Sequence, residues 1–91
     1  MVEHFQIDVV MPNTVTKIGY AAFSGCTKLK NVTMSTEIVT IEDYAFFNCV
    51  SLDVTIPDTV TEIGDNAFTP VLHITYHGTA TGSPWGAKSI N

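Results

Sequence analysis

The sequence has few charged residues and very few cations. Only 14% of its 91 residues are charged, and four Lys and Arg residues stand against nine Asp and Glu residues, which gives a formal net charge of −5. Unspecific binding to nucleic acid requires several cationic side chains that neutralise phosphates. The composition therefore argues against a nucleic-acid partner.

Long apolar runs are also missing. No segment approaches the ~20 apolar residues that a membrane-spanning helix needs, so we expect no membrane insertion. Residues 1–4 lack the basic start and apolar stretch of a signal peptide, so we expect no signal peptide in this chain. Hydrophobic residues nevertheless make up 45% of the sequence, which favours an ordered chain with a core. At this length we expect a single domain, residues 1–91.

What the sequence does contain is an internal repeat. Ile18, Ile41 and Ile63 are spaced by 41 − 18 = 23 and 63 − 41 = 22 residues. The same period relates further columns of equivalent residues: Val15, Ile38 and Val60; Ala22, Ala45 and Ala67; Phe23, Phe46 and Phe68; Cys26 and Cys49; Leu29 and Leu52. A period of this length is typical of solenoids, in which each coil buries its apolar residues against its neighbours.

Each repeat predicts a strand, a turn, a second extended piece and a short helical turn. The strands are expected near residues 9–11, 32–34, 54–56 and 74–76, where apolar and variable residues alternate. Asp43 and Asp65 precede the Ala-Phe pairs and are expected to cap the helical turns, while the Ala and Phe side chains point inward. We therefore predict an α/β repeat fold of about three coils of ~23 residues with a parallel sheet.

The two ends depart from the repeat. Residues 1–12 are expected to form an N-terminal strand with an open edge, residues 13–76 the repeats, and residues 77–91 a C-terminal cap. An open edge can pair with a second copy or with another coil. In the cap, Ser83 and Pro84 predict the start of a short helix that places Trp85 and Ile90 over the last coil.

The order strand, Ile-Pro, Val-Thr-x-Ile-Gly, x-x-Ala-Phe, x-x-Cys-x-x-Leu resembles the BspA-like class of leucine-rich repeats. The run from Ile56 to Phe68 follows this pattern almost throughout. The resemblance implies a right-handed solenoid without shared catalytic residues. It also implies a binding or adhesion role, commonly on cell-surface or secreted proteins of bacteria and some protozoa that attach to host or extracellular proteins.

No arrangement of residues predicts catalysis, a cofactor or a metal site. His73 and His77 are roughly 13 Å apart on an extended strand, too far to share one metal ion. Leu72, Ile74 and Tyr76 are expected to face the core opposite them. Cys26 and Cys49 lie one coil apart, where a disulfide is geometrically possible. The family pattern places both inward, which implies two free, buried thiols.

The outward residues of the strands remain as candidates for binding. Asp8, Asn31, Asp53 and His73 are expected to stack in one column and Val10, Thr33, Thr55 and Thr75 in the next, with Pro12, Ser35, Pro57 and His77 continuing the row. This polar surface suits a protein or glycan ligand, although a solvated sheet face has the same composition. Our first hypothesis is a non-enzymatic binding or adhesion module. The alternative is a structural piece or cap of a longer repeat array that self-associates through its N-terminal edge.

Overall fold

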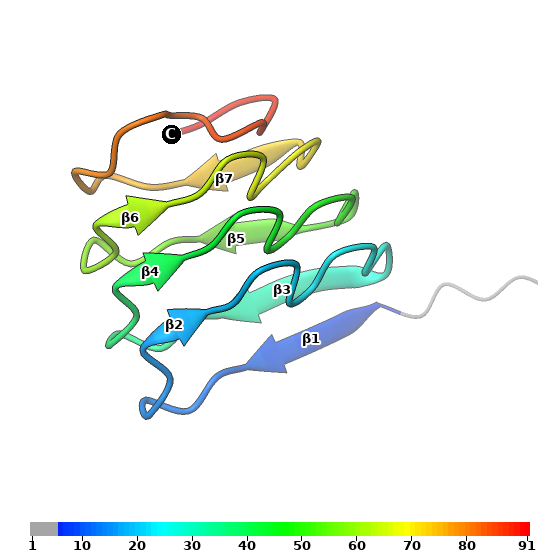
Figure 1. The fold of residues 1–91 in the computed structure, drawn as a ribbon. Coiled ribbons are helices and arrows are strands. Elements are labelled where there is room, and N and C mark those ends of the chain that lie inside the picture. Colours follow the sequence, from blue (N-terminus) through cyan, green and yellow to red (C-terminus); the bar gives the residue numbers. More distant parts are fainter. Residues whose placement is uncertain (1–5) are drawn as a thin grey trace, which may run out of the picture.

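The chain forms a solenoid of about three coils with two parallel sheets that face each other (Figure 1). The computed structural model describes residues 6–91, so the expectation about a signal peptide in residues 1–4 lies outside the described residues. The larger sheet has the order β1-β3-β5-β7 and comprises β1 Ile7–Val10, β3 Leu29–Thr33, β5 Asp53–Thr55 and β7 His73–Thr75. The smaller sheet has the order β2-β4-β6 and comprises β2 Lys17–Ile18, β4 Thr40–Ile41 and β6 Glu62–Ile63.

The repeat period determines the register of both sheets. Ile18 pairs with Ile41 and Ile41 with Ile63 in the smaller sheet, one coil apart in each step. In the larger sheet, Val32 pairs with Val54 and Val54 with Ile74. The side chains of these paired residues are buried and belong to one hydrophobic core. The predicted parallel stacking of equivalent residues is confirmed.

A ladder of aromatic rings runs through the core. The rings of Phe23 and Phe46 stack with centroids 5.1 Å apart and planes within 5°, and those of Phe46 and Phe68 stack at 5.3 Å and 8°. Ala45 and Ala67 beside them are fully buried. Each aromatic pair contributes roughly 0.5–1.5 kcal/mol beyond the area it buries. The Ala-Phe columns therefore act in stacking, as the repeat predicts.

The prediction of short helical turns was wrong, because residues 6–91 contain no helix. Between Gly19 and Cys26 the backbone N–H groups alternate in direction. Ala22 donates to Gly19 within the same coil, whereas Ala21 donates to Asp43 and Phe23 to Ala45 in the next coil. A helix would direct every N–H group along its own axis. The segment is instead a chain of tight turns stacked on the equivalent turns above it.

Backbone conformation explains why a helix cannot form there. Ala21, Tyr44 and Asn66 occupy equivalent positions and have φ values of +54°, +60° and +57°. A left-handed residue in each turn ends any right-handed helix and costs roughly 1–2 kcal/mol for a residue with a side chain. The hydrogen bonds between coils offset that cost. Local sequence shows Ala-Phe as a helical start only because the pairing partner lies 22 or 23 residues away.

The C-terminal segment continues the stack, and the predicted helix over it was also wrong. Trp85 has a positive φ of +54°, matching the turns below it, and its carbonyl oxygen accepts a hydrogen bond from Phe68. Ile90 forms a parallel bridge with Ile74, next to β7. The side chains of Trp85 and Ala87 are buried, whereas Ile90 remains 37% exposed. Trp85 therefore covers the core of the last coil and Ile90 extends the larger sheet.

Candidate binding surfaces

The predicted outward residues form a continuous surface on the larger sheet, which we call the polar strip. Pairing places Asp8 beside Asn31, Asn31 beside Asp53, and Asp53 beside His73. In the neighbouring column Val10 pairs with Thr33, and Thr55 pairs with Thr75. The polar strip comprises Asp8, Asn31, Asp53, His73, Thr33, Thr55 and Thr75. All are exposed except His73 and Thr75, which are half-buried.

Hydrogen bonds fix both ends of the polar strip. Asn31 Nδ2 donates to Asp8 Oδ1 at 3.1 Å, so two coils are joined at the surface. At the other end, Ser89 Oγ donates to the Leu72 carbonyl oxygen and lies 2.7 Å from His73 Nδ1. Because the single hydroxyl proton of Ser89 is used, His73 donates from Nδ1. A shallow hollow of about 630 Å³ lies over the middle, lined by polar-strip side chains together with Thr36 and Pro57.

Two residues beside the strip lie on the opposite side from the one predicted. Ser35 is fully buried, because its hydroxyl turns inward to accept a hydrogen bond from the Glu37 N–H at 3.0 Å. Leu72 was expected in the core but is 66% exposed, while Ile74 and Tyr76 are buried as predicted. The turn through Pro70 and Val71 buries Val71 instead. An alternating pattern therefore fails where a strand meets a turn.

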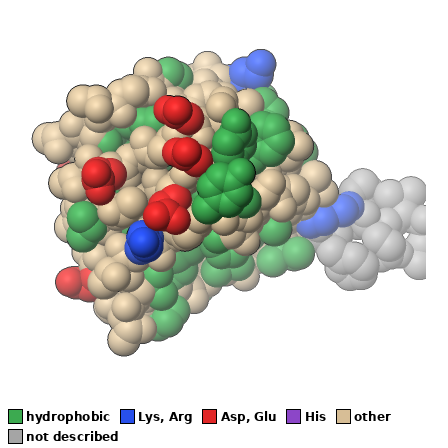
Figure 2. All heavy atoms as spheres, viewed as in Figure 1, with side chains coloured by type: hydrophobic (Ala, Val, Ile, Leu, Met, Phe, Trp, Pro, Cys, Tyr) green, Lys and Arg blue, Asp and Glu red, His purple; other side chains and the backbone are tan. Residues whose placement is uncertain are grey.

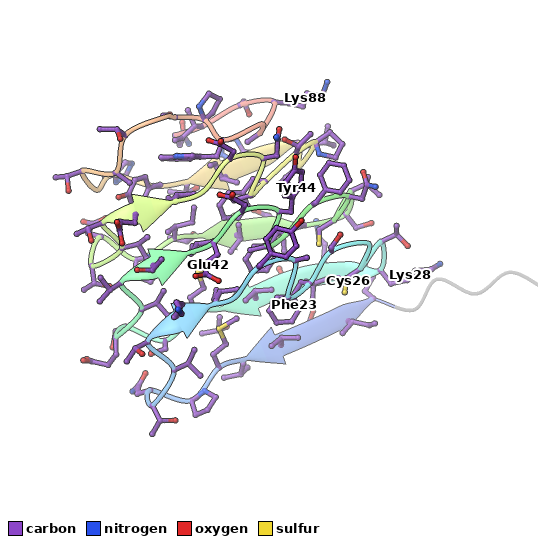
Figure 3. All side chains as sticks on the ribbon, viewed as in Figure 1. Phe23, Cys26, Lys28, Glu42, Tyr44 and Lys88 are labelled. Atoms are coloured by element: carbon purple, nitrogen blue, oxygen red, sulfur yellow. The ribbon has the colours of Figure 1, made fainter. Side chains whose placement is uncertain are left out.

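A second surface, which the sequence did not indicate as a site, lies over the smaller sheet. It is a groove of about 590 Å³ whose lining includes Tyr20, Glu42, Asp43 and Glu62, and we call it the acid–aromatic groove. Figure 2 shows acidic side chains gathered beside a hydrophobic patch on this face, and Figure 3 shows Tyr44 and Glu42 on the same side of the stack. Acidic and aromatic side chains therefore meet on one surface.

The aromatic part of this surface is a packed cluster. The rings of Tyr20 and Tyr44 meet edge to face with centroids 5.9 Å apart, and Tyr44 and Phe47 do so at 5.3 Å. Tyr20 is 68% exposed, while Tyr44 and Phe47 are half-buried beneath the surface. Tyr44 and Phe47 thus support Tyr20 from behind. A spacing of 24 between Tyr20 and Tyr44, one more than the repeat, hid this cluster from column alignment.

The carboxylates of the groove are held by bonds between coils. Glu42 Oε1 accepts from the Tyr20 N–H at 2.9 Å, and Asp43 Oδ1 accepts from the Asp65 N–H at 2.9 Å. Glu62 Oε1 accepts from the Thr40 hydroxyl at 3.3 Å. Asp43 therefore does not cap a helix in its own coil, as the sequence predicted. It satisfies a backbone donor of the following coil and is fixed in place by that bond.

The two cysteines are free thiols in unlike environments. Cys49 is fully buried and donates its Sγ–H to the Phe23 carbonyl oxygen at 3.0 Å, whereas Cys26 is half-buried. Burial away from water raises the pKa of the Cys49 thiol to about 11. A thiol with that pKa is neutral at physiological pH and unreactive. Cys49 is part of the core.

Metal and membrane sites were sought in the same way. Among residues 6–91, no three His, Cys, Asp or Glu side chains lie close enough together to hold a metal ion. His77 is exposed and His73 bonds to Ser89, while His4 lies outside the described residues. The part of the chain that the structure describes has no helix long and apolar enough to cross a membrane.

Comparison with known proteins identifies the repeat. The family model of the BspA type leucine rich repeat region, with six copies, matches residues 5–79. Neither a curated protein nor a solved structure matches the chain significantly. The match covers both sheets and the stacked turns, and the columns of buried residues explain it in physical terms. The chain belongs to the BspA-type leucine-rich repeat family.

Proposed function

We propose that this chain is a non-enzymatic binding or adhesion module that contacts a protein or glycan through the polar strip. The observation that carries this function is the regular, exposed strip itself, which places polar groups of successive coils side by side. Backbone hydrogen bonds between strands keep those groups in place before a ligand arrives, which lowers the entropic cost of binding. Family membership supports a repeat-based binding role.

A location at the cell surface or outside the cell belongs to the same proposal, as does a bacterial source. Both rest on the family resemblance. The partner is a protein or a glycan rather than a nucleic acid, because the net charge of −5 repels phosphate. Fractionation of the native cells, with detection of the chain on intact cells by antibody, tests the location.

Binding is tested with a panel of extracellular-matrix proteins and a glycan array, with the chain at high micromolar concentration. The informative variant is Thr55→Lys, at the centre of the polar strip. Its matched control is Thr79→Lys, because Thr79 is also exposed but lies in the loop after β7. We expect Thr55→Lys to abolish a signal that Thr79→Lys preserves. Equal binding by both variants, or no binding by the unmodified chain, would remove the strip from consideration.

Self-association through the N-terminal end of the stack is the second candidate function. β1 has a strand neighbour on one side only, and Ile7 is 50% exposed on it. An edge strand of this kind offers backbone groups and apolar side chains to a second copy. We expect light scattering to show a dimer that Ile7→Lys disrupts. Val50→Lys is the control, because Val50 is 47% exposed away from β1. A concentration-independent monomer would eliminate this candidate.

A further inference from the structure

We propose that the acid–aromatic groove is a second binding site, which takes a cationic segment of a partner protein, preferably one bearing arginine. The groove lies on the smaller sheet, whereas the polar strip lies on the larger one. The groove site is therefore independent of the function proposed above, and each can fail without the other.

The first step is the shape and chemistry of the groove. At about 590 Å³ it has room for a side chain and part of the backbone of an extended peptide. Its rim carries Tyr20, whose ring is 68% exposed although its neighbour Tyr44 packs against it. A tyrosine that is supported from behind and open in front presents a fixed aromatic surface. Binding to such a surface requires little ordering of the protein.

The second step is the charge. Glu42, Asp43 and Glu62 line the groove, and its lining contains no Lys, Arg or His. Lys17, with Nζ 3.4 Å from Glu42 Oε2, is the one cation that forms an ion pair with these carboxylates within residues 6–91. Three negative charges against one positive charge leave the surface acidic. Anionic ligands are repelled, and a cation gains attraction.

The third step is preorganisation. Asp43 and Glu62 each use one oxygen in a bond to another coil, to the Asp65 N–H and the Thr40 hydroxyl respectively. Those bonds hold the carboxylates at fixed positions and leave the second oxygen of each available to an incoming donor. A guanidinium group suits this arrangement best, because it donates to carboxylates in a planar fork and stacks on an aromatic ring at the same time.

The test uses a short capped Gly/Ser peptide that carries two arginines, titrated into the isotopically labelled full chain at low ionic strength. The matched control peptide replaces both arginines with citrulline, which keeps the shape and removes the charge. We expect the arginine peptide to shift the backbone amide signals of Tyr20 and Asp43 and to bind roughly 5-fold or more tightly than the citrulline peptide. Added salt should weaken the binding.

Variants separate the groove from general attraction to an acidic protein. Tyr20→Ala should weaken the arginine peptide roughly 2- to 5-fold, while Tyr20→Phe keeps the ring and the affinity. Glu62→Gln should weaken it by a similar factor, whereas Asp53→Asn, which removes the same charge from the polar strip, should leave it unchanged. The site is disproved if the citrulline peptide binds equally, if Asp53→Asn and Glu62→Gln act alike, or if no saturable shift appears.

Discussion

The two ends of the stack are built from equivalent residues in unequal surroundings. At the C-terminal end, Phe68 is fully buried between Phe46 and the covering segment that contains Trp85. At the N-terminal end, Phe23 is half-buried and Ala22 is exposed, although Phe46 and Ala45 in the next coil are fully buried. In a solenoid, therefore, the contribution of a residue to stability depends on the coil beside it as much as on the residue type.

The backbone shows the same contrast. Beyond β7, residues 89–91 supply partners for the edge: Ile74 donates to the Ser89 carbonyl oxygen and Tyr76 to that of Asn91. β1 pairs only with β3, so among the described residues its other edge has no strand partner. Edge strands with free backbone groups are sites of further pairing. One end of this molecule is closed by its own chain, and the other offers a surface for association.

The largest expected effect comes from the aromatic ladder. Phe46→Ala should lower the free energy of unfolding by about 3–5 kcal/mol, because the ring is fully buried and leaves a cavity. Phe23→Ala, at the open end, should lower it by about 1–2 kcal/mol, because a half-exposed ring loses less transfer free energy. Urea unfolding followed by circular dichroism measures both. Equal losses would show that the N-terminal end is covered in solution.

The next effect compares two glycines with positive φ. A Cβ at Gly86 would overlap the Thr69 side chain in the last coil, whereas a Cβ at Gly25 would meet nothing within 4 Å. Gly25→Ala should therefore cost only the backbone strain, about 1 kcal/mol. Gly86→Ala should cost about 2–5 kcal/mol, because overpacking adds to the strain. The same unfolding experiment serves. A similar cost at both positions would contradict a tightly packed C-terminal segment.

The smallest effect concerns the thiol that the stack buries. The pKa of Cys49 rises on folding from 9.0 to about 11, so folding favours the neutral thiol. The stabilisation is fully present below pH 9 and is lost as the pH rises through 11. Linkage gives at most about 2–3 kcal/mol across this window. Tyr and Lys titrate there too, so the quantity to measure is the difference between variants.

Stability measured from pH 8 to pH 11 should fall less steeply in Cys49→Ala than in the unmodified chain. Cys26→Ala is the matched control, since Cys26 occupies the equivalent position in the first coil and is only half-buried. Its pH profile should follow that of the unmodified chain. If both variants lose the same slope, burial of Cys49 is not the cause.

Much of the fold could be read from the sequence because the period carries it. Residues 22 or 23 apart stack in parallel, so the columns of Ile18 and Phe23 and the members of the polar strip followed from alignment alone. The helical turns and the terminal helix did not follow. Ala-Phe and Ser-Pro have local helical signals, but the backbone around Ala21 and Trp85 makes its hydrogen bonds to other coils, which no local pattern records.

The candidate sites divide in the same way. The polar strip consists of residues at a constant period, and β pairing places them together whatever the coil contains. The acid–aromatic groove combines residues at unequal positions in their repeats, such as Tyr20, Tyr44 and Glu62, so column alignment separates them. Only the folded chain brings them to one surface.

Periodicity thus decides the stacking of coils, the composition of the core and the residues that face outward along the strands. These features depend on sequence separation, which is visible in one dimension. The closed C-terminal end, the left-handed turns and the groove were decided by tertiary structure. They depend on where Trp85 and the turn at Tyr44 find hydrogen-bond partners and packing space, and that information exists only once neighbouring coils are in contact.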